Sequence, residues 1–231
     1  MQFQFDPVFA EMDLIVDGIV LTVLLSAGAI VFGSILATVL AALRSLGGRG
    51  ARLFVDCYVE LLRNTPFLVQ LFMIFFGLPM LGLRLSGTQA ALLAMVLNLS
   101  AYSTEIIRAG VEATHKSQIE AGMSLALTRL QVFRYVVLQP AFAKVWPALS
   151  SQFVLMLLAS SICSFISVQE LSGAAAIIEQ RTFRSFETYI IATLIYLVLA
   201  LALKVFLLWL GRRLFPQVSG LERVDARAEA A

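Results

Sequence analysis

The sequence predicts an all-α polytopic membrane protein with five transmembrane helices, an N-terminus outside the cytoplasm and a C-terminus inside it. Three observations predict this class: an apolar composition, five long apolar runs and an uneven distribution of Lys and Arg. Of the 231 residues, 60% are hydrophobic and only 14% are charged, against about 25% charged residues in soluble domains. The net charge of +2 gives no reason to expect a nucleic-acid partner.

The five runs are long enough to cross a hydrocarbon core of about 30 Å, which takes about 20 mostly apolar residues. They cover residues 18–43, 66–83, 85–104, 145–169 and 188–211. The second run is slightly short, and residues 53–65 can extend it at the cost of admitting Glu60 and Arg63. The fifth is interrupted only by Lys204, which we expect to snorkel toward the cytoplasmic surface. Five spans place the two termini on opposite sides.

Basic residues decide the orientation, because short loops rich in Lys and Arg stay cytoplasmic. They follow the first, third and fifth spans: Arg44, Arg49, Arg52; Arg108, Lys116, Arg129, Arg134, Lys144; Arg212, Arg213, Arg223 and Arg227. The other side has Arg84, Arg181 and Arg184, the last two offset by Glu170, Glu179 and Glu187. We therefore expect an extracytoplasmic segment (residues 1–17), a transmembrane domain (18–213) and a cytoplasmic polar tail (214–231). The first 43 residues hold no Lys or Arg, so a cleavable signal with a basic start is not expected.

The first span carries small residues at four-residue intervals: Ala29, Gly33, Ala37 and Ala41. Small side chains on one helical face let backbones approach closely, which is how helices associate in lipid. Two interpretations remain open from the sequence. The stripe packs within the chain, or it forms a seam between two copies.

The loop between the third and fourth spans, about residues 109–143, holds an amphipathic pattern. Its apolar residues recur at steps of three or four: Ile119, Met123, Ala126, Leu127, Leu130, Phe133 and Val137. This period predicts one helix, which Pro140 should end before Pro147 restarts the chain. The helix could lie on lipid, pack on the chain's own helix ends or dock on a soluble partner. With only Arg129 and Arg134 as basic residues, the lipid surface is disfavoured, and periodicity does not choose between the other two.

The residues of this loop carry a resemblance. The segment EIIRAGVEATHKSQIEAGMSLALTRLQVFRYVVLQPA (residues 105–141) resembles the cytoplasmic loop of bacterial ABC importer permeases, most closely the polar amino acid branch (histidine, glutamate, glutamine, arginine and opine). The family loop opens with Glu-Ala-Ala, has a glycine four residues later and closes with Leu-Pro. Here Glu120-Ala121-Gly122 match the opening, Ala126 replaces the glycine, and Leu138-Gln139-Pro140 separates the final pair. Gly122 is expected to supply some of the freedom that the replaced glycine would give the bend.

The resemblance continues outside the loop, in DGIVLTVLLSAGAI, YVELLRNTPFLVQLF, ISVQELSGAA and QRTFRSFETY. It implies the type I ABC importer permease fold and ATP-driven import of a polar amino acid across the bacterial cytoplasmic membrane. The implied partners are an ATP-binding cassette dimer, a second permease chain (the same or a homologous one), an extracytoplasmic solute-binding protein and membrane lipid. ATP and Mg belong to the partner, since none of the three lysines follows a glycine as GxxxxGK[ST] requires. No cofactor and no metal are expected in this chain.

The resemblance also assigns residues to the contact with the ATPase. They are Glu120, Ala121, Gly122, Ala126, Leu127 and Leu130. Another role for Glu120, which can coexist with the first, is that of an acid at a helix N-terminus complementing the helix dipole. We interpret the lone His115 as a solvated loop residue.

Polar groups inside spans are costly, so each is a candidate for the transport pathway or for a structural pair. Two pairs, Glu60 with Arg63 and Glu105 with Arg108, are three residues apart and could each compensate internally. We expect them to act as gate or scaffold. The pathway candidates are Asn98, Ser100, Tyr102, Ser160, Ser161 and Ser164. Asn98 and Tyr102 are four apart and share a helical face, although hydrogen bonding between helices explains them nearly as well.

Two functions other than an ABC importer permease are less consistent with the sequence. A secondary transporter or channel would use no ATP, but five spans with opposite termini do not divide into the equal halves of an inverted repeat. A membrane enzyme is disfavoured because the chain has one histidine, no acid–histidine cluster and no metal-ligand spacing. Cys57 and Cys163 are interpreted as small apolar residues. The sequence does not choose the amino acid that is carried, nor between a homodimeric and a heterodimeric permease pair.

Overall fold

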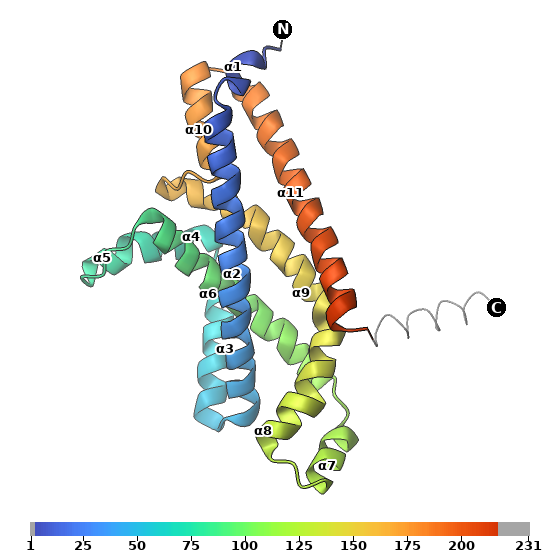
Figure 1. Cartoon of the computed structure of the whole chain (residues 1–231). Coiled ribbons are helices and arrows are strands. Elements are labelled where there is room, and N and C mark those ends of the chain that lie inside the picture. Colours follow the sequence, from blue (N-terminus) through green and yellow to red (C-terminus); the bar gives the residue numbers. More distant parts are fainter. Residues whose placement is uncertain (1–2, 217–231) are drawn as a thin grey trace, which may run out of the picture.

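The computed structural model describes residues 3–216, and this part of the chain is built of helices without a strand (Figure 1). The predicted polar tail falls mostly on residues 217–231, outside the described part. The α-helices are α1 (Asp6–Phe9), α2 (Met12–Leu46), α3 (Arg49–Arg63), α4 (Phe67–Phe72), α5 (Leu78–Met80), α6 (Gly87–Glu112), α7 (Lys116–Ser124), α8 (Arg129–Gln131), α9 (Gln139–Ala159), α10 (Leu171–Thr182) and α11 (Ser185–Leu214). Residues Met73–Gly77 and Val132–Leu138 form π-helices, and Ser160–Ile166 form a 3₁₀-helix. Helices suit such an apolar chain because each satisfies its own backbone groups without water.

Five crossings account for these helices. Within residues 3–216, four segments are long and apolar enough to span a membrane: Met12–Leu46, Gly87–Glu112, Arg129–Ile166 and Ser185–Leu214. A fifth candidate is a bent pair, Arg49–Arg63 with Phe67–Met80, whose halves meet at 107°. The residues in contact between α2 and α6 follow the same order in both helices: Gly28 with Leu92, Gly33 with Leu99, and Ala37 with Thr104. The two helices are therefore parallel, so the bent pair must carry the chain back across, and the predicted five-span class is confirmed.

The small-residue stripe of α2 lies inside the chain. Ala29, Gly33, Ala37 and Ala41 are all buried, and Ala29, Ala37 and Ala41 belong to the main apolar core with residues of α6 and α9. A side chain on Gly33 would meet Leu99 at 3.2 Å. Of the two interpretations that the sequence left open, packing within the chain is the one that the structure adopts.

The second span is not the continuous helix that the sequence predicted. It breaks at Asn64–Pro66, where Pro66 has extended backbone angles and the residue before a proline is disfavoured in a helix. The side chain of Gln70 repairs the break, since its Nε2 donates to the carbonyls of Leu62 at 2.7 Å and Thr65 at 3.0 Å. The carbonyl oxygens freed at the end of α3 are thus satisfied inside the fold.

Pro140 does not end a helix as predicted. It occupies the start of α9, which runs on through Pro147. The π-helix Val132–Leu138 comes immediately before it, and the other π-helix, Met73–Gly77, likewise ends two residues before Pro79. The wider π turn makes room for a proline ring that would clash with the carbonyl four residues earlier in an α-helix.

A further correction concerns residues 170–187, which the sequence presented as an outside loop. They form α10 and the start of α11, and Glu170 is fully buried rather than solvated. Its carboxylate accepts hydrogen bonds from the Gly173 N–H at 2.9 Å, from Thr22 at 3.4 Å and from Tyr196. A polar side chain can be buried when it is hydrogen-bonded this fully, and here the bonds tie α2, α10 and α11 together. Arg181, expected to be offset by loop acids, instead pairs with Glu11 of the N-terminal segment at 2.9 Å.

The α2–α6 contact gives a first prediction. Replacing Ala37, which is fully buried, with Leu should destabilise the fold by about 1–3 kcal/mol because a well-packed core does not accommodate three extra carbons. Val39→Leu, on the exposed face of the same helix, is the matched control and should change little. The midpoint temperature of unfolding of the purified complex in detergent measures both. Equal midpoints for the two variants would show that α2 does not depend on this contact.

Candidate functional site

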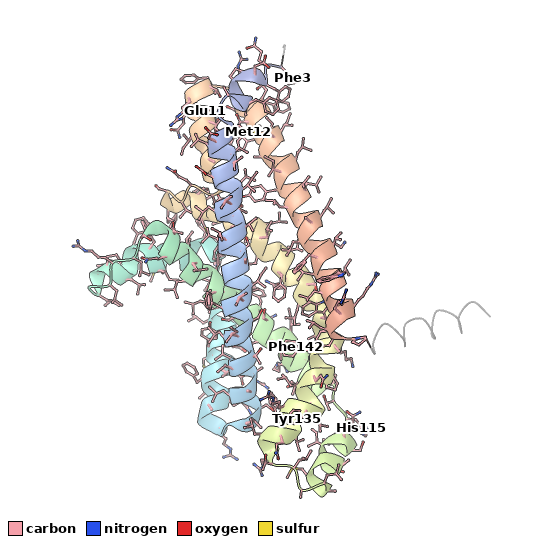
Figure 2. All side chains as sticks on the ribbon, viewed as in Figure 1. Phe3, Glu11, Met12, His115, Tyr135 and Phe142 are labelled. Atoms are coloured by element: carbon pink, nitrogen blue, oxygen red, sulfur yellow. The ribbon has the colours of Figure 1, made fainter. Side chains whose placement is uncertain are left out.

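The loop after α6 forms one end of the molecule. Figure 2 places His115 and Tyr135 at this end and Phe3, Glu11 and Met12 at the other. We refer to the end with α7 as the cytoplasmic end, following the orientation predicted from the basic residues. His115 is exposed and also caps α7, because its Nδ1 accepts the Ser117 N–H at 3.3 Å.

Glu120 lies in the second turn of α7, because the helix begins at Lys116. Helix-dipole effects fall off within the first turn. The alternative role of Glu120 as an N-terminal helix acid therefore has little support, and its exposed carboxylate is available to a partner.

The single amphipathic helix predicted for residues 119–137 is wrong, because the chain turns at Ala126. Ala126 has a φ of 58°, with its N–H bonded to the Met123 carbonyl at 3.0 Å, and the Leu127 N–H reaches the Gly122 carbonyl at 3.3 Å. This is a Schellman ending with a left-handed residue, the place where glycine is usual. Ala126 stands where the family loop has its glycine. Gly122, expected to supply freedom for the bend, is instead inside α7, where a side chain would meet Val132 at 3.1 Å.

The turn divides the predicted apolar stripe into two parts. Phe133 and Val137 are buried at 5% and 4% exposure, and Leu127 packs partly against them, so this part holds the loop to its own chain. The other part of the stripe is exposed, as are Glu120 and Ala121. Leu125, which does not belong to the stripe, is also exposed, at 76%. We define the coupling surface as Ile119, Glu120, Met123, Leu125 and Leu130. Leu125 lies off the apolar stripe, so the helical period did not indicate it.

A chain of alternating charges leads from this end of the molecule to the break in the second span. Arg44 of α2 contacts Asp56 of α3 at 2.6 Å and Glu112 of α6 at 3.4 Å. Arg108 contacts Glu112 at 2.6 Å and, through its Nε, Glu105 at 2.7 Å. These pairs connect three helices near the loop. Of these pairs, only the one between Arg108 and Glu105 was predicted from the sequence.

The chain of charges ends at Arg63, which lies 3.7 Å from Glu105. The expected pair between Glu60 and Arg63 is therefore wrong. Glu60 is exposed and makes no ion pair within the described residues. Arg63 is the last residue of α3, so its side chain reaches across to α6, where its guanidinium also stacks on Tyr102 with 5.6 Å to the ring centre.

A cavity of about 490 Å³ lies at the break of the second span. Its lining comes from the break, from α6 and from α9, and the polar members are Arg63, Asn64, Thr65, Asn98, Tyr102 and Gln152. The structure therefore brings the predicted pair Asn98 and Tyr102 to one cavity. Ser100, predicted with them, faces elsewhere: it is fully buried and hydrogen-bonded to Tyr58 at 2.6 Å.

Gln70, which was not among the residues predicted from the sequence, supports this cavity. Besides bridging the helix break, its Oε1 accepts a hydrogen bond from the Asn98 amide at 2.9 Å. In the sequence, this role was indicated only by the position of Gln70, a glutamine in an otherwise apolar run four residues after a proline. Gln70 thus fixes the position of Asn98 relative to the break.

The predicted serines of the fourth span fall in the 3₁₀-helix and separate. Ser160 is fully buried and donates to the Leu157 carbonyl at 2.7 Å. Ser161 and Ser164 line a second cavity of about 570 Å³, formed with α10 and the start of α11. Ala159 lines the first cavity, two residues before Ser161. The start of the 3₁₀-helix therefore passes between the two cavities.

Comparison with known proteins assigns the chain to a family. Residues 18–216 match the family described as the binding-protein-dependent transport system inner membrane component. The chain belongs to this family. This permease is 34% identical over 206 residues to a probable glutamine ABC transporter permease of Bacillus subtilis (89% of the chain, 95% of the relative). It is 31% identical over 216 residues to the glutamine transport system permease of Escherichia coli (93% and 99%).

Solved structures agree. A structure described as an amino acid ABC transporter with histidines matches the permease with a TM-score of 0.83 at 35% identity, covering 92% of this chain and 100% of that one. The MetNI methionine ABC transporter matches with a TM-score of 0.76 at 17% identity, covering 88% and 97%, which shows the fold alone. The permease therefore has the type I ABC importer permease fold. In this family the ATPase is a separate subunit, and a binding protein also takes part.

The left-handed turn gives a second prediction. Ala126→Gly should slow hydrogen exchange of the α7 amides about fivefold, because glycine removes about 1 kcal/mol of strain at a positive φ. Ala121→Gly, inside α7, should have the opposite effect, since glycine weakens a helix interior. Exchange measured by mass spectrometry on the loop peptides tests both. Faster exchange in Ala126→Gly would contradict the assignment of strain to this residue.

Proposed function

We propose that this permease moves a polar amino acid across the bacterial cytoplasmic membrane through the cavity at its broken span. The energy comes from ATP hydrolysis on a partner bound at the coupling surface. One observation carries the proposal: α6 and α9, which line the cavity, are the two helices that the α7 loop connects. The names of the relatives, which mention glutamine and amino acids, support the substrate class.

The loop can act as a rigid connection. Gly122 allows α7 to pack on the π-helix that continues into α9, and only residues 113–115 separate α7 from α6. A force applied to α7 by a closing pair of ATPase subunits is therefore transmitted to both helices. Because both helices line the cavity, their movement would change the side on which it opens. This is the rigid-body type of conformational switching.

The coupling surface has the chemistry of a docking site for a soluble protein. Large apolar side chains exposed at the cytoplasmic end mark an interaction site when they cluster, and Leu125 and Leu130 are 76% and 64% exposed. Glu120 adds one negative charge among them. We expect the partner to offer an apolar cleft with a basic or hydrogen-bonding group for Glu120.

The cavity offers groups that suit an amino acid. Arg63 is a guanidinium that can bind a carboxylate in a bidentate manner. Asn98 and Gln152 offer amides for a polar side chain. A broken helix at this depth is how several transporters place polar groups around a substrate.

A second permease chain, the same or a homologous one, is expected to complete the pathway, because five helices are few to enclose it. The ATP-binding dimer and the solute-binding protein complete the proposed assembly. A secondary transporter would need no ATPase, so the ATPase partner distinguishes the two functions. Co-purification of an ATP-binding subunit with this chain would support the importer.

A third prediction tests the coupling surface. Leu125→Asp and Glu120→Lys should each abolish ATP-driven uptake in proteoliposomes that contain the full complex and binding protein, while the chain still inserts in the membrane. The reason is that a new charge or a reversed one cannot dock in an apolar or basic site. Leu46→Asp, at another exposed leucine of the cytoplasmic end, is the control. Uptake at the wild-type rate in both loop variants would refute the assignment of this surface.

A fourth prediction tests the cavity. Asn98→Leu should lower the rate of uptake of a polar amino acid by roughly two- to tenfold, the value of one lost hydrogen bond of about 0.5–1.5 kcal/mol. Affinity of the separate binding protein for the amino acid should not change. Ser100→Ala, whose hydroxyl does not face the cavity, is the matched control. If Ser100→Ala loses as much uptake as Asn98→Leu, the effect belongs to the α6 helix and not to the cavity.

A further inference from the structure

A third hollow of the permease is apolar and lies away from both polar cavities. It is a groove of about 640 Å³ between α2, α9 and α11. The walls are large apolar side chains such as Phe142, Trp146 and Phe206, and the smallest lining residues are Ser26, Ala27, Ser34 and Ala202. Figure 1 shows α2 and α11 side by side near α1 and separating toward the cytoplasmic end, with α9 between them. α9 packs against both helices.

The length of the groove matches one leaflet of a bilayer. Along α11 its lining runs from Leu199 to Leu210, which is about 16 Å at 1.5 Å per residue. Half of a hydrocarbon core of about 30 Å is about 15 Å. Leu210 is followed by Arg212 and Arg213 in the last turn of α11. Along α11 the groove therefore occupies the part of the helix next to its cytoplasmic end.

A positive charge stands at the cytoplasmic end of the groove and on its face. Arg213 follows the lining residues Leu210 and Phe206 by three and seven positions, which places it on the same side of α11. Its guanidinium lies 5.3 Å from the centre of the Trp209 ring. Tryptophan and arginine at a helix end mark the level of the lipid head groups. The cytoplasmic leaflet is the one whose surface carries negative lipid charge.

Trp146 joins α9 to α11 at the cytoplasmic end of the groove. The Trp146 indole donates its N–H to the Leu207 carbonyl at 3.0 Å and lies so close to Gly211 that a side chain there would meet it at 2.3 Å. Phe215 packs on the same indole with 5.6 Å between ring centres. This contact holds α9 against α11 at the cytoplasmic end of the groove.

We propose that a phospholipid with an anionic head group occupies this groove, with one acyl chain between α2, α9 and α11 and its phosphate beside Arg213. This site is separate from the proposed transport pathway. The groove is lined by apolar side chains along its length and has a guanidinium at its cytoplasmic end, which is the pattern that an acyl chain with an anionic head group would match. A bound chain covers the exposed edges at Val23, Val31 and Phe206, which are 43–54% exposed.

The first experiment fills the groove. The complete transporter is purified in mild detergent from membranes that contain phosphatidylglycerol, and native mass spectrometry counts the retained phospholipids. Ala202→Phe places a ring in the groove, and Leu201→Phe places the same ring on the neighbouring exposed position that does not line it. We expect Ala202→Phe to lose retained phosphatidylglycerol and Leu201→Phe to keep it. Equal retention in the two variants would overturn the proposal.

The second experiment removes the charge. Arg213→Gln should lower the preference for phosphatidylglycerol over phosphatidylcholine about fivefold, the contribution of one basic residue near a charged surface. Arg49→Gln, an exposed arginine of the same membrane side on α3, is the control and should leave the preference unchanged. Equal effects of the two substitutions would show that general surface charge, and not this groove, selects the lipid.

A third experiment identifies the occupant directly and does not depend on how well the variants fold. A photo-crosslinking amino acid at position 202 is activated in the assembled transporter in membranes. A covalent adduct with the mass of a phospholipid supports the proposal. An adduct with a polypeptide, or the absence of any lipid adduct when the same group at position 201 gives one, overturns it.

Discussion

The close contact between α2 and α6 is the constraint on which the rest of this permease depends. In lipid, helices gain nothing from hiding apolar side chains, so association relies on close van der Waals packing. Gly33 and Ala37 provide that packing against Leu99 and Thr104. Because the two helices are parallel, the chain between them must return across the membrane. That return is the broken span, and the polar cavity exists only where it breaks.

Polar side chains then join the helices of the bundle. Toward the cytoplasmic end, alternating ion pairs run from Arg44 through α6 to Arg63, and on the opposite half Glu170 joins α2, α10 and α11 by hydrogen bonds. The first set reaches from the cavity, at Arg63, to the last residue of α6, at Glu112, next to the coupling loop. The ion pairs thus run from the cavity to the end of α6, where the loop that carries the coupling surface begins.

Function in this fold depends on departures from regular helix. The break at Asn64–Pro66 makes the cavity, the left-handed Ala126 turns the loop, and the 3₁₀-helix Ser160–Ile166 begins between the two polar cavities. Each departure is supported locally, for example by Gln70 donating to the carbonyls that the break frees. The regular part of α9 and α11 instead leaves an apolar groove toward lipid. The molecule therefore separates a cavity with polar lining at the helix break from an apolar groove between α2, α9 and α11.

The sequence by itself determined the membrane class, five crossings, the family and the existence of a cytoplasmic loop with an exposed Glu120. These features follow from composition, the length of apolar runs and local motifs. Only the tertiary structure decided that Arg63 pairs with Glu105 instead of Glu60, that Glu170 is buried, and that Leu125 faces outward. The physical reason is that a side chain takes the partner nearest in space. That partner can lie 42 residues away in the chain, as between Arg63 and Glu105, and no local period records it.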